Sequence, residues 1–160
     1  MKILMVCLGN ICRSPLAEGI LKEKINSRAL QAEIDSAGTA AYHDGEKPDP
    51  RSQAIAFKHG IDISKQRARQ FEVGDFEKFD RIFAMDSHNL QDLVALANNR
   101  QEAEKVEMIL NKVHPDEDRS VPDPYYGGSD GFQKVYNMLN AACEIIADEI
   151  AASQKTGNNL

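Results

Sequence analysis

The sequence predicts a single α/β domain in which a doubly wound, four-stranded parallel sheet carries helices on both faces, giving three layers. Short segments of strand length alternate with longer segments in which apolar residues recur at helical spacing. No linker or internal repeat divides the 160 residues, and this length suits one domain. We assign residues 1–152 to the domain and expect residues 153–160 to form a frayed polar tail.

The expected strands comprise residues 3–6, 33–36, 81–85 and 105–110. The first is a run of four apolar residues, as parallel sheets buried on both faces use. The expected helices comprise residues 15–28, residues 51–59, a segment capped by Ser87, and residues 132–152. In such a sheet ligands bind at the carboxyl ends of the strands.

The loop after the first expected strand has the composition of an anion-binding site. Gly9 and Asn10 are residue types that tolerate left-handed backbone conformations. Ser14 and Pro15 are typical of an N-cap and a first helical position, so we expect a helix to begin there. Successive backbone N–H groups in such a loop, next to a helix N-terminus, form a nest for an anion.

Cys7 and Arg13 stand six positions apart at the two ends of this loop. A thiol at a helix N-terminus beside an arginine ionises readily, and the thiolate is the nucleophile. The planar guanidinium of Arg13 matches two oxygens of a phosphoryl group. The alternative is a buried cysteine with an unrelated arginine nearby; the strand, the Gly-Asn pair and the Ser-Pro pair make the phosphate-binding interpretation the stronger one.

Asp123 is the candidate general acid. It lies between Pro122 and Pro124, which restrict the backbone and hold the carboxyl on a stiff loop. Like-charge repulsion from a bound phosphate dianion would keep this carboxyl protonated, as a general acid requires. An ordinary turn aspartate is the alternative, and the presence of the Cys7 loop favours the acid.

These motifs resemble those of the low-molecular-weight protein tyrosine phosphatases, and the resemblance covers almost the whole chain. It implies that Cys7 forms a phosphocysteine intermediate, that Arg13 binds phosphate and that Asp123 is the acid and base. It also implies that the Ser14 hydroxyl lies near the Cys7 sulfur and that Ser36 supports the loop by hydrogen bonding to Asn10. The implied phosphate-binding loop comprises Leu8, Gly9, Asn10, Ile11, Cys12 and Ser14.

The expected substrate pocket has one apolar and three aromatic walls: Ile11, Tyr42, Tyr125 and Tyr126. Such walls favour a flat phenyl ring above the phosphate site, whereas a phosphoserine stem is too short to reach the sulfur. In the protein-arginine-phosphatase relatives the resemblance predicts threonine at the position of Ile11. We therefore expect a phosphotyrosine-containing protein or a small aryl phosphate as substrate.

Three polar positions have open interpretations. Gln66 stands where the family often has a histidine that supports the phosphate loop, so any support here comes from an amide. Asp80 and Asp86 flank the third expected strand. For these two carboxylates, turn and capping roles are as consistent with the sequence as a role in a hydrogen-bond network.

The three cysteines predict redox chemistry and no metal site. Cys12 shares the loop with Cys7, and a neighbouring thiol can trap a cysteine sulfenic acid as a disulfide; a loop-packing cysteine is the alternative. Cys143 lies in a helical pattern and suits the core. No Cys-x2-Cys pair is present and the four histidines are scattered, so we expect neither zinc nor a cofactor.

Composition bears on partners and location. The net charge of −6 and the lack of a basic run disfavour nucleic-acid binding. No segment has the length and apolarity of a membrane span or a secretory signal, and an unpaired reactive thiol suits a reducing cytoplasm. Nothing in the sequence predicts an oligomeric state.

Three rival functions share features of this site. Arsenate reduction on the same scaffold needs further cysteines near the third strand, where this chain has none. A phosphocysteine carrier of a sugar-uptake system needs no acid loop, whereas Asp123 is present here in its full context. A silent phosphotyrosine-binding module has no need for Cys7, Arg13 and Asp123 together.

Overall fold

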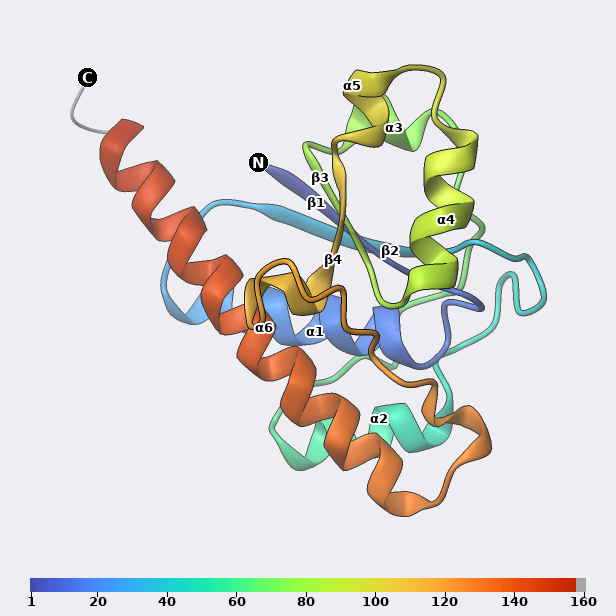
Figure 1. The fold of residues 1–160 in the computed structure, drawn as a ribbon. Helices are drawn as coiled ribbons and strands as arrows, with labels where there is room; N and C mark the ends of the chain where they lie inside the picture. The colour runs from blue at the N-terminus through green and yellow to red at the C-terminus, as the bar shows by residue number, and fades with distance from the viewer. Residues whose placement is uncertain (158–160) are drawn as a thin grey trace.

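A computed structural model describes residues 1–157 and shows a four-stranded sheet whose neighbouring strands are all parallel (Figure 1). The strands lie in the order β2-β1-β3-β4, so the chain winds outward from β1 in both directions. The predicted fold class is confirmed. The strands are β1 (Lys2–Cys7), β2 (Glu33–Gly38), β3 (Arg81–Ala84) and β4 (Val106–Met108).

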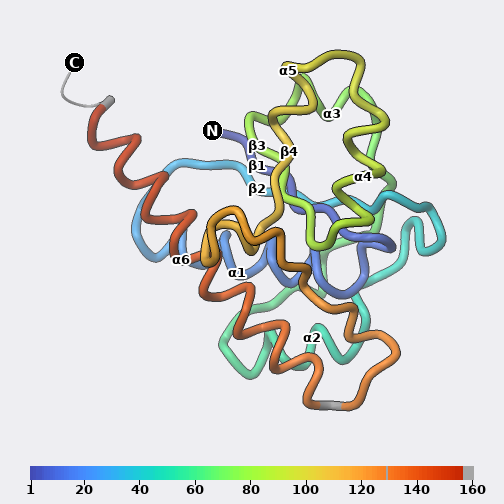
Figure 2. Tube along the Cα trace, viewed as in Figure 1, coloured from blue at the N-terminus to red at the C-terminus, as the bar shows by residue number. Residues whose placement is uncertain are grey.

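Helices cover both faces of the sheet. On one face α1 (Arg13–Ser27) and α6 (Ser129–Gly157) lie side by side, with α2 (Pro50–Lys58) packed against both (Figures 1 and 2). On the other face α4 (Ser87–Leu96) packs against β3 and β4. The short helices are α3 (Asp75–Lys78), α5 (Arg100–Ala103) and the 3-10 turns η1 (Ile109–Lys112) and η2 (Pro124–Tyr126).

Strand β1 is apolar from Ile3 to Cys7 because its side chains enter two different cores. Ile3 and Met5 belong to the core between the sheet and helices α1 and α6. Leu4 and Val6 belong to the core on the opposite face, with Phe76. Side chains alternate across a strand, so a central parallel strand needs apolar residues at every position.

Two helix N-termini differ from the prediction. Helix α1 begins at Arg13, with Cys12 at the N-cap, and Ser14 is not the cap. The reason is that the Ser14 hydroxyl contacts Cys7 and Asn10. Helix α4 is capped by the Asp86 side chain, not by Ser87, in a reciprocal arrangement with Asn89.

Other boundaries also differ from the prediction. The segment after Met108 turns into η1, so β4 is shorter than expected. Helices α3 and α5 were not predicted, since helices of one turn carry little periodicity. Helix α6 begins at Ser129 and continues to Gly157. It therefore includes part of the expected frayed tail, where the side-chain amide of Gln154 bonds to the backbone of Gln31; residues 158–160 of that tail lie outside the described residues.

Cys143 lies in the core, as the sequence predicts. Its side chain is buried beside Ala17 of α1, and burial raises the pKa of its thiol to about 12. Within residues 1–157, none of the helices combines the length and the apolar character that crossing a bilayer demands.

Candidate active site

The loop at residues 8–12 connects the carboxyl end of β1 to the start of α1. Asn10 adopts a left-handed conformation with φ of 57°, which turns the loop back toward the helix. Within residues 1–157, the backbone N–H groups of this loop have no protein hydrogen-bond acceptor. Together with the N-terminus of α1 they form the nest that the sequence predicts.

Carbonyl oxygens at the two ends of the loop accept hydrogen bonds from groups outside it. This leaves the inner face of the loop to its N–H groups. Gly38 at the end of β2 permits the close approach, because a Cβ there would lie 2.6 Å from the carbonyl oxygen of Leu8. The outer donors are the backbone N–H groups of Thr39, Ala40 and Asp49 and the hydroxyl of Ser52, which bond to the carbonyls of Cys7, Leu8, Ile11 and Cys12 over 2.8 to 2.9 Å.

A buried chain of hydrogen bonds runs from the Cys7 sulfur into the protein. The Ser14 hydroxyl lies 3.0 Å from Cys7 Sγ. Asn10 Nδ2 donates to Ser14 Oγ over 2.8 Å and to Ser36 Oγ over 3.0 Å. Ser36 Oγ in turn donates to Glu18 Oε1 over 2.7 Å. The contacts that the family resemblance implies for Ser14 and Ser36 are therefore present.

The direction of these hydrogen bonds follows from the donors available. The backbone N–H of Arg69 donates to Asn10 Oδ1 over 3.0 Å, which fixes the orientation of the amide. Asn10 Nδ2 has two hydrogens, and both serine oxygens accept one. Ser36 must then give its own hydrogen to Glu18. Ser14 keeps its hydrogen for one of two acceptors, the Cys7 sulfur at 3.0 Å or the carbonyl of Ala37 at 3.4 Å, and the contact with the sulfur is the shorter. The network thus presents a donor to the nucleophile.

Glu18 ends this chain, and the sequence analysis missed it. Its side chain is buried, and burial raises the pKa of its carboxyl, an effect that the hydrogen bonds from Lys22 and Ser36 oppose. Lys22 Nζ donates to Glu18 Oε2 over 2.5 Å. The available signal was the spacing, since Glu18 lies four residues after Ser14 and so on the same face of α1.

Arg13 lies on the inner wall of the site with its side chain buried. Its Nη1 donates to Asp86 Oδ2 over 2.6 Å and to the carbonyl of Val121 over 2.9 Å. Burial opposes its charge, but Cys7, Asp86 and Asp123 raise the pKa of the guanidinium above its ordinary value. Asp86 therefore both caps α4 and orients Arg13, and the two interpretations left open by the sequence both hold.

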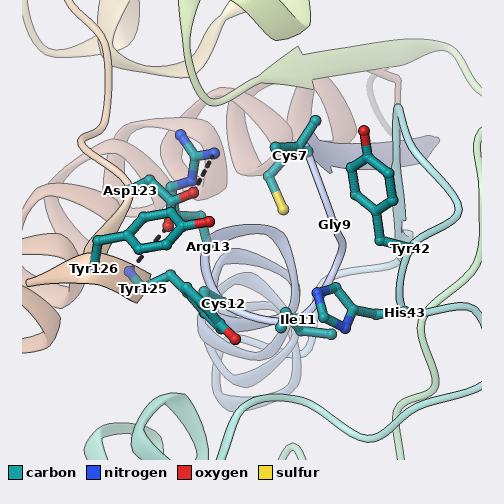
Figure 3. Close-up of a pocket in the computed structure, with 11 residues that line it drawn as sticks. Cys7, Gly9, Ile11, Cys12, Arg13, Tyr42, His43, Asp123, Tyr125 and Tyr126 are labelled. Atoms are coloured by element: carbon teal, nitrogen blue, oxygen red, sulfur yellow. Dashed lines mark hydrogen bonds and ion pairs between the residues drawn. The ribbon is translucent and has the colours of Figure 1, made fainter.

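Asp123 reaches the same pocket from the segment before η2. Its Oδ1 accepts from the backbone N–H of Tyr125 over 3.0 Å, which fixes the carboxyl. Its Oδ2 lies 3.6 Å from Arg13 Nη2. Figure 3 shows the Asp123 and Arg13 side chains together on one side of the pocket, with the Cys7 sulfur facing the same space.

The cavity above Cys7 has a volume of about 290 Å³ and brings together the predicted pocket residues. Tyr42 lies on one side of it and Tyr125 and Tyr126 on the other (Figure 3). Tyr126 is 90% exposed, so the rim is open to solvent. The sequence analysis missed His43, which also lines the pocket and bonds to Glu46. The lining residues are Cys7, Leu8, Gly9, Ile11, Cys12, Arg13, Tyr42, His43, Asp123, Tyr125 and Tyr126.

Gln66 does not join the network of Asn10 and Ser36. Its Nε2 donates to the carbonyl of Pro15 over 3.1 Å, so this amide supports the first turn of α1. The loop is supported instead through Arg69, whose guanidinium is paired with Asp75 at 3.0 Å and with Asp35 at 3.1 Å. No group of three or more histidine, cysteine or acidic side chains suited to a metal occurs within the described part of the chain.

A parallel α/β sheet with a cysteine at its carboxyl edge, in a loop beside a helix N-terminus, defines a class of α/β proteins with a candidate anion-binding loop and a candidate nucleophile. The family model described as low molecular weight phosphotyrosine protein phosphatase matches residues 2–156. The chain belongs to this family, which is a family of hydrolases.

Individual relatives agree over most of their length. A low molecular weight phosphotyrosine protein phosphatase of Schizosaccharomyces pombe is 44% identical over 86% of this chain and 89% of its own. A crystal structure of a protein tyrosine phosphatase from Entamoeba histolytica has a TM-score of 0.89, with 37% identity over 96% of this chain and 99% of that one. The structure of a Drosophila arginine phosphatase has a TM-score of 0.86, with 35% identity over 93% and 97%.

Proposed function

We propose that this protein hydrolyses phosphotyrosine monoesters through a phosphocysteine intermediate on Cys7. The observation that carries the proposal is the convergence of Cys7, Arg13 and Asp123 on one cavity, although Asp123 comes from the opposite end of the chain. A nucleophile, a phosphate-binding cation and a proton donor are the groups that phosphoryl transfer from an aryl ester needs.

In the first step, the Cys7 thiolate attacks phosphorus while the bond to the phenolic oxygen breaks. Asp123 gives its proton to this oxygen, so the leaving group departs as a neutral phenol. Arg13 and the free N–H groups of residues 8–12 bind the three equatorial oxygens of the transferring group. In the second step, water attacks the phosphocysteine, Asp123 takes a proton from it, and inorganic phosphate and the Cys7 thiolate are released.

The hydrogen-bond network supports the thiolate form of the nucleophile. The Ser14 hydroxyl accepts from Asn10 and keeps its own hydrogen, which can point at the sulfur because this 3.0 Å contact is shorter than the 3.4 Å contact with the Ala37 carbonyl. A hydrogen bond to an ionised acceptor is about twice as strong as one to a neutral acceptor. The Ser14 hydroxyl is therefore placed to donate to the thiolate that the proposed reaction uses.

The shape of the pocket favours an aryl phosphate. Tyr42 and Tyr125 can flank a phenyl ring, and Ile11 presents an apolar wall below it. A guanidinium would gain less from these walls, because no carboxylate other than Asp123 lines the cavity within the described residues. For this reason we favour a phosphotyrosine-containing protein over a phosphoarginine one, although the structural neighbours include arginine phosphatases.

Cys12 is proposed to protect the nucleophile. If peroxide oxidises Cys7 to a sulfenic acid, the Cys12 thiol can displace water and form a Cys7–Cys12 disulfide. Burial, with the negative charges of Asp49 and Cys7, raises the pKa of Cys12 to about 12, so this capture should accelerate with pH. The described cysteines are all unpaired, and we propose a reducing, cytoplasmic location on this ground.

Hydrolysis of p-nitrophenyl phosphate between pH 4 and 8 tests the mechanism. We expect turnover by the wild type, none above background for Cys7→Ser and a large loss for Asp123→Ala. Phosphotyrosine, phosphoserine and phosphoarginine peptides of one sequence test the substrate class. Comparable kcat/KM for all three would contradict the preference for phosphotyrosine. Stoichiometric phosphate transfer to Cys7 without turnover would instead indicate a phosphocysteine carrier.

A further inference from the structure

A second, mostly apolar groove lies next to the candidate active site, between helix α2 and the segment that leads into α6. Its volume is about 450 Å³. Ala54, Ile55 and the ring of Phe132 form its apolar surface. Gly127 and Gly128 form part of the opposite side, where the lack of side chains keeps the groove open. The sequence analysis did not anticipate this groove, and the proposed mechanism does not use it.

A single side chain separates this groove from the catalytic cavity. The Arg51 guanidinium lies 5.3 Å from the ring centre of Tyr125 and 4.8 Å from that of Phe132. Its Nη1 also donates to the carbonyl of Tyr125 over 3.1 Å, and two further bonds hold it to Asp49. Tyr125 lines the catalytic cavity and Phe132 lines the groove. The Arg51 side chain therefore lies between the cavity and the groove.

The charge of the groove differs from that of the whole chain. The protein has a net charge of −6, yet the two charged side chains among the described residues of the groove are Arg51 and Lys58. Because Arg51 is already paired with Asp49, Lys58 is the cation most available to a ligand. An apolar surface edged by a lysine complements an apolar side chain with a carboxylate beside it.

We propose that this groove binds the substrate polypeptide, taking an apolar side chain that flanks the phosphotyrosine and placing a neighbouring acidic residue near Lys58. This specificity site rests on the proposed phosphatase function. Arg51 contacts both Tyr125 of the cavity and Phe132 of the groove, so the groove is within reach of residues that flank a phosphotyrosine bound above Cys7. Binding there is remote from the reacting atoms, so it lowers KM and leaves kcat nearly unchanged.

Peptide kinetics test the proposal. One phosphotyrosine peptide is made with leucine or serine at each flanking position in turn, and p-nitrophenyl phosphate serves as the reference substrate. At one position we expect leucine to raise kcat/KM about tenfold, mainly through KM, as an apolar pocket does. A peptide with glutamate beside that leucine should have a lower KM than the same peptide with lysine there. The protein variant Lys58→Glu should reverse this order.

Ala54→Trp fills the groove from an exposed position on α2. It should abolish the preference for leucine while the peptide and p-nitrophenyl phosphate are still hydrolysed. Ala95→Trp is the matched control, since Ala95 is exposed on α4 and should retain the preference. Equal leucine-to-serine ratios in the wild type and both variants would overturn the proposal. Failure of the wild type to hydrolyse p-nitrophenyl phosphate would instead overturn the phosphatase function itself.

Discussion

The phosphate loop and the acid segment meet at one cavity but are built in different ways. The phosphate loop is mostly buried: Cys7 and Asn10 are each 2% exposed and Ser14 is fully buried, while Leu8 faces solvent. The acid segment carries exposed side chains such as Tyr126. Its contacts with the body of the protein include the bond from Arg13 to Val121 and the bond from Arg51 to Tyr125.

This difference separates two demands on an enzyme of this kind. Stabilisation of the transition state needs donors that are already in place, and a mostly buried loop whose carbonyls at Leu8, Ile11 and Cys12 are held from outside provides them. Proton transfer and substrate recognition require side chains that can reach leaving groups of different shapes. A short solvent-exposed segment can present such side chains. We therefore expect substitutions in the loop to damage catalysis for all substrates, and substitutions in the acid segment to have effects that depend on the substrate.

After Cys7→Ser, the largest loss should come from Arg13→Lys, with kcat/KM for p-nitrophenyl phosphate falling about 10³-fold. Lysine keeps the charge but cannot bond to Asp86 and Val121 while also facing two phosphate oxygens. Steady-state kinetics check this result. Arg28→Lys is the control, because Arg28 forms a surface pair with Glu144, and it should change the rate less than twofold. Retention of a tenth of the activity by Arg13→Lys would mean that the loop needs charge alone.

Asp123→Asn should lower kcat about 10²-fold for p-nitrophenyl phosphate. The loss should be greater for phenyl phosphate, because phenolate is the poorer leaving group and depends more on protonation. The comparison of the two substrates is the measurement, and Asp92→Asn on the exposed surface of α4 is the control. An equal loss for both substrates would show that Asp123 acts through charge or position and not as an acid.

Two substitutions at Asn10 separate its side chain from its backbone. Asn10→Gly removes the bonds to Ser14 and Ser36 but tolerates the φ of 57°, and we expect kcat/KM to fall about tenfold. Asn10→Ala adds a strain of about 1 kcal/mol, because alanine is disfavoured in the left-handed conformation. This should lower either kcat/KM or the folding equilibrium constant about fivefold below that of Asn10→Gly. Kinetics and urea unfolding of both variants check this. Identical behaviour of the two would show that the backbone conformation is not under strain.

The smallest expected effect comes from substitution of Glu18, and it is an effect on the free energy of unfolding. Because burial raises the pKa of Glu18, the folded protein holds this proton to a higher pH than the unfolded chain, and the free energy of unfolding falls as pH rises through that interval. Glu18→Gln should remove this part of the pH dependence, a change of about 1 kcal/mol. Urea unfolding at pH 5 and pH 7 measures it.

Glu23→Gln is the matched control for this measurement, since Glu23 is an exposed neighbour on the same helix. It should leave the pH dependence of unfolding as in the wild type. If Glu18→Gln has the same dependence as the wild type, Glu18 is equally ionised in the folded and unfolded protein, and it acts in the network only as a hydrogen-bond acceptor.

Local sequence predicted the phosphate loop well because its features are local. The apolar run of β1, the glycine and asparagine of the turn and the start of α1 all lie within about fifteen residues. The same locality explains the errors. Ser14 was predicted to cap α1, but its hydroxyl bonds to Cys7 and Asn10, contacts that propensity alone does not distinguish from a cap.

The partners that complete the site come from distant segments. Glu18, Arg69 and Asp86 reach the loop through the packing of α1, the segment before α3 and the N-terminus of α4. Spacing could place Glu18 on the same face of α1 as Ser14, but it could not pair Glu18 with Ser36. Arg69 and Asp86 share no short motif with the residues that they contact. The groove beside Arg51 likewise exists only because α2 lies next to the segment that precedes α6.

The sequence by itself determined the fold class, the anion-binding loop and the candidate nucleophile, cation and acid, because strand and helix periodicity and residue chemistry are properties of short segments. The tertiary structure alone decided where each hydrogen bond in the network points, which side of Tyr125 the second groove opens on and which charges are buried. These depend on groups far apart in the chain that approach within hydrogen-bonding distance only after the sheet and its helices have packed.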